Sequence, residues 1–370
     1  MRLKFILSLS FILLLVQLSF SQKDSLKYSF SDNLYVSGQY GGGFLIAHRS
    51  SLEPLVNTYT HSFLLEIGKT SYGKKSWEQL YNYPTLGLGY YHGNLGNDDI
   101  FGTTNALYGF IEAPYFPEKK VAFGYKFGFG LAYLSEKFDI DKNIYNVAIG
   151  SHINFFIHFS FDGKLNLLQD RLFIKTGLGF SHMSNGKTQT PNLGLNILDW
   201  HLSMGYYLGQ RIPHYSSNFP KPSKHLFMFI VAGGFKEFTE ANLGKYFAGN
   251  TTIEYEYSVG NKINWGLGSD IFYDGVVHEE LIQKNDTKAS QHATRVGLHA
   301  SYTIYYHKVG FIIQMGSYIA PYYTDDGYIY HRVGFRVKIS KNLLANLTMK
   351  THWGRADIVE FGLGYYFTKK

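Results

Sequence analysis

Apolar residues alternate with small or polar residues over most of the chain, so that the pattern repeats at every second residue. The segment 120–134, KVAFGYKFGFGLAYL, places Val121, Phe123 and the following odd-numbered apolar residues opposite glycine, alanine and lysine. Segments 332–340, RVGFRVKIS, and 358–367, IVEFGLGYYF, alternate in the same way. A period of two is typical of β-strands that have one apolar face. The chain is therefore predicted to be all-β.

The number of such segments indicates a large sheet. Together with the turn signals between them, they predict about 14 to 16 antiparallel strands, and a bacterial single-chain barrel has an even number. Strands are expected to begin near Leu34, Thr60, Thr85, Asn105, Val121, Val147, Leu172, Ile197, His225, Thr251, Ile263, Thr294, Val309, Ile329, Leu344 and Ile358. The segment from His225, HLFMFIVAGGFKEF, is apolar on both faces and is expected to pack against something inside.

The two faces of these strands differ in a way that indicates their surroundings. Aromatic residues recur on the apolar face of nearly every segment, whereas the opposite face carries glycine with scattered lysine and arginine. A secreted two-layer sandwich also alternates, but its outward face would be the charged one. In a transmembrane barrel the apolar face meets lipid, Tyr and Trp lie near the interfaces, and the lumen is polar. We therefore predict a transmembrane antiparallel β-barrel, whose closure removes exposed edge strands.

The N-terminus predicts export from the cytoplasm. Residues 1–21 have the features of a secretory signal peptide, with Arg2 and Lys4 before an apolar stretch and small residues before a cut at Gln22. Beyond this cut the chain has no apolar run of the roughly 18 residues that a spanning helix requires. Residues 22–370 are accordingly assigned to a barrel in the bacterial outer membrane.

Composition narrows the chemistry further. The chain has 31 Tyr, 30 Phe, 39 Gly and no Cys among 370 residues, which excludes a disulfide framework, a thiolate metal site and a thiol nucleophile. Aromatic and basic residues are abundant, but their alternation predicts girdles, so no nucleic-acid platform is expected. The stretch 211–224, RIPHYSSNFPKPSK, is the best candidate for a linker, but a periplasmic turn is the simpler interpretation.

One strand ends in a polar group that the alternation does not explain. In the stretch 180–194, FSHMSNGKTQTPNLG, His182 and Ser184 continue the apolar face of Leu178 and Phe180. Residues two apart on a strand share a face, and an imidazole beside a hydroxyl is the base and nucleophile of acyl transfer. The alternative is that the strand simply enters a polar loop.

The wider motif favours the first interpretation. His182-x-Ser184-Asn185, followed by Pro191-Asn192-x-Gly194, resembles the lipid A 3-O-deacylase family, the PagL-like outer-membrane barrels with acyloxyacyl hydrolase activity. The resemblance, strongest over 171–209, implies that His182 is the base and Ser184 the nucleophile. It also implies that Asn185, with the backbone N–H groups of the Asn185-Gly186 loop, forms the oxyanion site.

The sequence departs from the family at one position. The family has a glutamate two residues after the glycine of N-x-G, and this chain has Asn196 there. Asparagine can accept the imidazole N–H and fix its tautomer, but it cannot supply negative charge to an imidazolium. Asp199, the nearest acid, has the opposite parity and is expected to point into the lumen. We therefore predict Asn196 as the residue that orients His182.

The resemblance implies an ester hydrolase that acts on lipopolysaccharide in the outer leaflet. An acyl chain of lipid A would lie along Leu178, Phe180, Leu198 and Trp200, and Ser184 would attack its 3-O-ester. No metal or organic cofactor is implied, and the oligomeric state is left open. The formal charge of +7 suits an anionic substrate, although lumen and turn residues explain it equally well. Lys187 could meet a lipid A phosphate, or be a solvated loop residue.

Two other functions remain open at this point. A non-enzymatic channel or transporter is one, because a barrel of about 16 strands can leave an aqueous lumen. A phospholipase with the same serine and histidine is the other, since the sequence does not separate one ester substrate from another.

Overall fold

The computed structural model describes residues 29–117, 119–214, 224–238 and 244–369. The predicted signal peptide, residues 1–21, lies outside the described residues. Sixteen strands make up the fold, and every strand pairs antiparallel with its neighbours. Within the part of the chain that is described, no helix is both long and apolar enough to cross a membrane.

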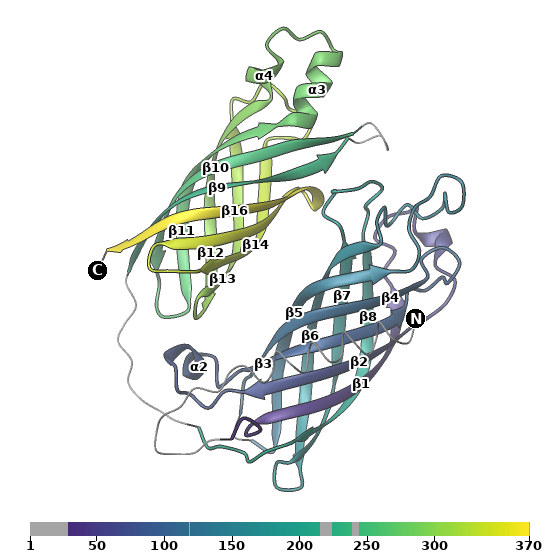
Figure 1. Ribbon diagram of the computed structural model, residues 1–370, viewed down its shortest axis with the longest axis vertical. Coiled ribbons are helices and arrows are strands. Elements are labelled where there is room, and N and C mark those ends of the chain that lie inside the picture. The colour runs from purple at the N-terminus through teal and green to yellow at the C-terminus, as the bar shows by residue number, and fades with distance from the viewer. Residues whose placement is uncertain (1–28, 118, 215–223, 239–243, 370) are drawn as a thin grey trace, which may run out of the picture.

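The strands close into two separate barrels of eight strands each (Figure 1). The first barrel contains β1 (Leu34–Leu45), β2 (Thr60–Thr70), β3 (Thr85–Asn94), β4 (Thr103–Pro114), β5 (Val121–Leu134), β6 (Ile153–Leu167), β7 (Leu172–Ser184) and β8 (Leu195–Tyr207). The second contains β9 (His225–Glu237), β10 (Lys245–Ser258), β11 (Ile263–Asp274), β12 (Thr294–Tyr306), β13 (Val309–Ile319), β14 (Ile329–Lys338), β15 (Leu343–His352) and β16 (Arg355–Lys369). The described helices are short: η1 (Glu53–Leu55), α2 (Ser76–Leu80), α3 (Gly275–Gln283) and α4 (Ala289–His292).

The predicted class and strand number are confirmed, but the strands do not close as the single barrel assigned to 22–370. β1 pairs with β8, and β9 pairs with β16, so each group of eight is complete by itself. The stretch 211–224, predicted as a periplasmic turn, falls in sequence between β8 of the first barrel and β9 of the second, and its residues 215–223 lie outside the described residues. The alternation determines which face of each strand is apolar. The same alternation is expected whether the sheet closes after eight strands or after sixteen. The sequence pattern therefore could not reveal the division.

One strand begins later than predicted. β6 was expected near Val147 and begins at Ile153. Ala148 and Ile149 are fully buried and belong to the apolar core of the first barrel. The apolar run therefore covers the mouth of the barrel as a loop, and it does not extend the strand.

The two barrels lie side by side and point in the same direction. At one end, Thr190 in the β7–β8 loop donates its backbone N–H to Glu237 at the end of β9, at 2.5 Å. At the other end, the Tyr81 hydroxyl after α2 donates to the carbonyl of Tyr305 at the end of β12, at 3.0 Å. Figure 1 shows the same arrangement, with α3 and α4 at the far end of the second barrel from the β12–β13 turn.

The interior of the first barrel combines aromatic packing with separate ion pairs. Tyr35, Phe173 and Tyr207 pack edge to face, with ring centroids 5.1 to 5.5 Å apart. Lys126 pairs with Glu66 at 2.6 Å. A second buried pair joins Lys175 to Glu112 at the same distance. The lumen is thus filled by side chains, as expected for eight strands.

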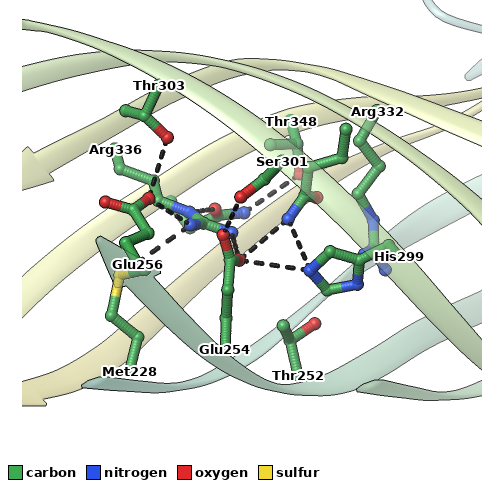
Figure 2. A network of polar contacts seen from close by, with 12 residues as sticks. Met228, Thr252, Glu254, Glu256, His299, Ser301, Thr303, Arg332, Arg336 and Thr348 are labelled. Atoms are coloured by element: carbon green, nitrogen blue, oxygen red, sulfur yellow. Dashed lines mark hydrogen bonds and ion pairs between the residues drawn. The ribbon is translucent and has the colours of Figure 1, made fainter. Parts of the chain in front are cut away.

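The interior of the second barrel is a continuous polar network (Figure 2). Arg336 donates to Glu254 at 2.7 Å, and Glu254 also accepts from Ser301 and Gln314. Glu256 accepts from Thr303 and Tyr305 in the next layer. The segment from His225, apolar on both faces, packs inside as predicted: Leu226, Met228, Ile230 and Ala232 form a buried cluster with Leu344 and Tyr366.

Candidate functional site

The predicted site residues lie on the outer face of the first barrel, at the end of β7. The β7–β8 register places His182 directly opposite Asn196. Phe180 is opposite Leu198, and Leu178 is opposite Trp200, in the next two outward-facing pairs. The polar pair and the predicted substrate-facing residues thus form one continuous stripe. Strand parity alone predicts this shared face, because alternate residues of a strand point the same way.

Ser184, His182 and Asn196 are joined by hydrogen bonds. The Ser184 Oγ lies 2.9 Å from His182 Nε2. The other ring nitrogen, Nδ1, lies 2.6 Å from Asn196 Oδ1. Since an amide oxygen only accepts, Nδ1 carries the proton and Nε2 offers its lone pair to the serine hydroxyl. This is the tautomer that a general base requires.

A residue from a distant loop fixes the orientation of Asn196. His48, between β1 and η1, has its Nε2 3.1 Å from the carbonyl oxygen of Leu193. A carbonyl can only accept, so Nε2 carries the proton and the neutral ring uses Nδ1 as an acceptor. Asn196 Nδ2 lies 3.0 Å from that Nδ1 and donates to it. The Asn196 amide therefore turns its oxygen toward His182. His48, Asn196, His182 and Ser184 form one series in which the direction of each hydrogen bond is determined.

Nothing in the sequence pointed to His48, which is 148 positions from Asn196. Its only local signal is a histidine among loop residues, and the chain has 15 histidines. The sheet brings it to the site because β1 pairs with β8, and Leu45 lies opposite Ile197. The closure of the first barrel through β1 and β8, which the sequence pattern could not reveal, therefore also brings His48 to the site.

Asp199 points inward, as its parity predicts. Its carboxylate is 4 % exposed and lies 3.0 Å from His201 Nδ1. The other nitrogen of His201 contacts Asp162 at 2.6 Å. Asp199 therefore belongs to the polar interior of the barrel, on the opposite side of the wall from His182.

Asn185 links the loop between β7 and β8 to itself and to a neighbouring loop. It donates its Nδ2 hydrogens to Ser151 Oγ in the β5–β6 connection and to the Gln189 carbonyl, both at 2.9 Å. Its backbone N–H donates to Asn192 Oδ1 at 3.0 Å. All the donors of Asn185 are therefore used by these two loops. Asn185 organises the loop, and in this structure it has no N–H left for an oxyanion.

Two glycines of the motif occupy positions that a side chain would not tolerate. Gly186 and Gly194 both have positive φ angles, +63° and +80°. A Cβ on Gly194 would lie 2.9 Å from the His182 ring, so this glycine lets the loop pass close to that ring. A Cβ on Gly186 would collide with Val359 of the second barrel.

The second barrel contacts the same loop through Glu237. The buried carboxylate of Glu237 accepts from the backbone N–H and the hydroxyl of Thr190, at 2.5 and 3.0 Å. Its own backbone N–H donates to the carbonyl of Lys187 at 3.3 Å. The motif loop is therefore held between two barrels. No sequence pattern pointed to Glu237, since it is an ordinary strand-end residue far from the motif.

Lys187 is partly buried and lies beside the second barrel. It lines a polar cavity of about 310 Å³ at the mouth of the second barrel, together with Lys236, Asp326 and Asp357. Burial lowers the pKa of Lys187 from its ordinary value, and Lys236 adds to the lowering. The alternative of a phosphate contact at this lysine is not supported by its position.

An apolar hollow lies beside the stripe on the outer wall. Its volume is about 480 Å³. It is lined by Leu178, Leu198 and Trp200 together with Phe44, Tyr59 and His61. Three of the four predicted substrate-facing residues thus line a hollow of the size that suits part of an acyl chain.

Comparison with known families agrees with this geometry. Residues 62–206 match the family model described as lipid A 3-O-deacylase (PagL), and residues 225–370 match the acyloxyacyl hydrolase, C-terminal domain. The chain belongs to the PagL-like lipid A 3-O-deacylase family. The two matched ranges coincide closely with the two barrels, and the family supports lipid A deacylation as the activity.

The remaining comparisons add little. No curated protein matches the chain. Solved structures that match include a triple mutant of the Rhodopseudomonas blastica porin, at 8 % identity and a TM-score of 0.18, covering 90 % of this chain and 99 % of the porin. A second variant of that porin matches with the same values. These scores are too low to carry an argument about this chain.

Proposed function

We propose that this protein is an outer-membrane serine esterase that hydrolyses the 3-O-linked acyl chain of lipid A. The observation that carries the proposal is the hydrogen-bonded series Ser184, His182 and Asn196 on the outer wall of a barrel. On the outer wall this serine faces lipid, where a soluble substrate would not reach it. A nucleophile in that position suits a substrate whose acyl chains lie against the wall.

The outer surfaces of both barrels support a location in lipid. Leu107 and Leu267 are 67 % and 68 % exposed, and apolar side chains of this kind surround both barrels. A continuous apolar surface of this extent is unfavourable in water and suits a bilayer. The β7–β8 loop lies at the same end as the long connections 46–59, 135–152 and 275–293. In outer-membrane barrels the longer loops are extracellular, so Ser184 would face the outer leaflet.

The reaction follows from the hydrogen-bond directions. Ser184 Oγ attacks the ester carbonyl carbon while its proton passes to His182 Nε2. The tetrahedral intermediate then collapses, the C–O bond to lipid A breaks, and His182 returns the proton to the leaving 3-hydroxyl. A water, deprotonated by the same Nε2, attacks the acyl-serine. The fatty acid leaves, and the proton returns to Ser184.

The oxyanion needs donors other than Asn185. Among the described residues, the backbone N–H of Gly186 and the Nδ2 of Asn192 make no hydrogen bond, and both belong to the motif loop. We assign these two groups to the oxyanion. Preorganised donors of this kind each contribute roughly 10²-fold or more to acyl transfer.

Asn196 in place of the family glutamate changes the electrostatics but not the tautomer. The 2.6 Å contact to His182 Nδ1 remains, and His48 prevents the amide from turning over. What is missing is negative charge beside the imidazolium that forms during attack. We expect an active enzyme whose rate is limited by that missing charge.

The interiors of the barrels argue against the channel alternative. Each barrel has eight strands, and large side chains such as Arg295, Tyr330, Phe156 and Lys126 are fully buried inside them. An eight-stranded barrel filled in this way leaves no continuous aqueous path. No observation favours a phospholipase, but the test below includes a phospholipid as a second substrate.

The test is mass spectrometry of lipid A and of a diacyl phospholipid after incubation with the purified protein and its Ser184→Ala variant. We expect lipid A to lose one 3-hydroxyacyl chain with the unaltered protein only. Loss of acyl chains from the phospholipid instead would replace the proposal by a phospholipase, and equal hydrolysis by the variant would refute the nucleophile.

A further inference from the structure

A large apolar groove lies between the two barrels, away from the site described above. Its volume is about 1120 Å³, beyond the usual range of small-molecule pockets. The outer faces of β4 to β6 supply one wall, and β12 to β16 supply the other. Phenylalanines dominate the lining: Phe127, Phe129, Phe159, Phe311, Phe335 and Phe361. The barrels touch within it, since Phe129 and Phe335 lie 5.2 Å apart between ring centroids.

The groove occupies the half of the barrels opposite to Ser184. Its lining includes the beginnings of β3 and β13 and the ends of β4 and β12. At this end most connections are short turns, and the β2–β3 connection, which contains α2, is the longer exception within the first barrel. Aromatic residues close it there: Tyr81 stacks on Tyr306 at 4.0 Å, and Tyr125 shares a 2.8 Å hydrogen bond with the Tyr306 hydroxyl. Such residues mark the membrane interface, so the groove lies in the leaflet on this side.

Basic residues from both barrels stand just outside this aromatic closure. Lys75 before α2 and His307 and Lys308 in the β12–β13 turn all line the groove, and the lining contains no carboxylate. Trp77 stacks on His307 at 6.0 Å, which brings the two turns together. Burial lowers the pKa of His307, and the charges of Lys75 and Lys308 add to the lowering, as expected for three close basic groups.

The two lysines of this rim have no direct ion-pair partner. Among the described residues, no carboxylate forms an ion pair with Lys75 or Lys308. Glu78 is close enough for its charge to act on His307, but its carboxylate accepts from the backbone N–H groups of Gly73 and Lys75 at 3.1 and 3.3 Å. An apolar groove with two unpaired lysines at its rim is complementary to a molecule with acyl chains and one phosphate.

We propose that the groove binds one glycerophospholipid, with its acyl chains between the barrels and its phosphate at Lys75 and Lys308. The inference rests on the membrane location in the proposed function. It excludes lipid A as the occupant, because the groove opens toward the leaflet opposite to the one that Ser184 faces. The bound lipid fills the space between two curved walls that cannot pack against each other along their whole length.

Such a lipid would help to set the angle between the barrels. In a bilayer, apolar contact between two proteins has little hydrophobic driving force, because lipid is equally apolar. The direct polar contacts between the barrels lie at their two ends, at Tyr81 and at Glu237. A lipid held between them adds packing contacts in the intervening half, and so steadies the loop that carries Ser184.

The test is native mass spectrometry of the full-length Ser184→Ala protein, stripped of lipid and titrated with phosphatidylglycerol in detergent. This variant has no turnover, so binding is measured independently of hydrolysis. We expect one lipid per protein, and an affinity about tenfold weaker in Lys75→Gln/Lys308→Gln. Lys74→Gln is the matched control, since Lys74 is an exposed neighbour that does not line the groove, and it should bind like the parent.

Three outcomes would overturn the proposal: no stoichiometric phospholipid, an equal loss of affinity in the Lys74 control, or stronger retention of lipid A than of phosphatidylglycerol. Because all three residues are exposed, unfolding is not expected to confuse the result. Lipid binding with no deacylase activity in the unaltered protein would remove the proposed reaction and leave the lipid site standing.

Discussion

The two barrels have the same strand number, direction and apolar exterior, but the candidate site lies on the outer wall of the first barrel only. The first barrel carries a hydrogen-bonded series of serine, histidine and asparagine at the outer ends of β7 and β8. The second barrel also has polar residues at this end, such as Ser317 and His331, but no hydrogen bond joins these two among the described residues. In the interiors, it is the second barrel that has the more extensive polar network. The first is filled by rings and separate ion pairs such as Lys126–Glu66, whereas the second has a connected network around Glu254 and Arg336.

Under the proposed function, the first barrel carries the chemistry and the second serves as a scaffold. The proposed site depends on strand register and on loops at the rim, and not on what fills the lumen. The second barrel contributes a rigid rim, because Glu237 and Val359 contact the loop that follows Ser184. Substitutions in either barrel test this division of roles.

The largest effect is expected from the nucleophile. Ser184→Ala should lower the rate of lipid A deacylation by about 10⁴-fold or more, since among the described residues no other hydroxyl contacts His182 Nε2. Ser317→Ala is the matched control, because Ser317 is an exposed serine on the outside of the second barrel at the same end. It should leave the rate unchanged, and a comparable loss there would contradict the division. The rate is read from the fatty acid released.

Asn196 should show the next largest effect. Asn196→Leu removes the acceptor that fixes the His182 tautomer, and we expect a loss of about 10²-fold in kcat. Asn196→Asp is the sharper variant, because its carboxylate fits the same 2.6 Å contact and adds the missing charge. It should keep or raise kcat by up to about tenfold. A rate equal to that of the leucine variant would show that Asn196 does not orient the base.

His48 should have a smaller effect. In His48→Ala the Asn196 amide loses the acceptor for its Nδ2 and can rotate, so we expect kcat to fall by about tenfold with little change in KM. Steady-state kinetics of lipid A deacylation gives both quantities. A kcat equal to that of the parent would limit His48 to a packing role.

Glu237 tests the contribution of the second barrel to the site. Glu237→Ala should lower kcat by about fivefold, because the loop after Ser184 loses two hydrogen bonds to its carboxylate. Glu237→Gln retains an acceptor oxygen and should recover most of the rate. Equal kcat values in the two variants would show that the second barrel does not act on the site through Glu237.

The smallest effect on activity is expected inside the second barrel. Arg336→Met leaves the buried Glu254 without its 2.7 Å partner and should lower the free energy of unfolding by roughly 3 to 5 kcal/mol. The rate per folded molecule should stay within about twofold of the parent. Denaturant unfolding in detergent gives the first quantity and the deacylation assay the second. A large loss of rate in folded protein would mean that the network reaches the site.

Much of the fold was predictable because strand parity is local. Most strands begin within two residues of the predicted positions, such as Leu34, Thr60 and Val309. Val147 was misplaced because a buried loop and a strand are equally apolar. The division into two barrels depends on the pairing of β1 with β8, a long-range contact that no local pattern encodes.

The site shows the same limit. His182, Ser184 and Asn196 were predictable because they share a parity and lie near one another along two consecutive strands. His48 and Glu237 come from segments that only the closure and the packing of the barrels bring to the loop. Asn185 was assigned a donor role from the motif, but its hydrogen bonds are determined by Ser151 and Gln189, which the motif does not include.

The most direct measurement is a rapid acid quench of the protein with lipid A, followed by tandem mass spectrometry of its peptides. The account predicts a 3-hydroxyacyl group on Ser184, absent from the Ser184→Ala protein and strongly reduced in His182→Ala. An acyl group at another residue, or release of the fatty acid by the Ser184→Ala protein, would contradict it.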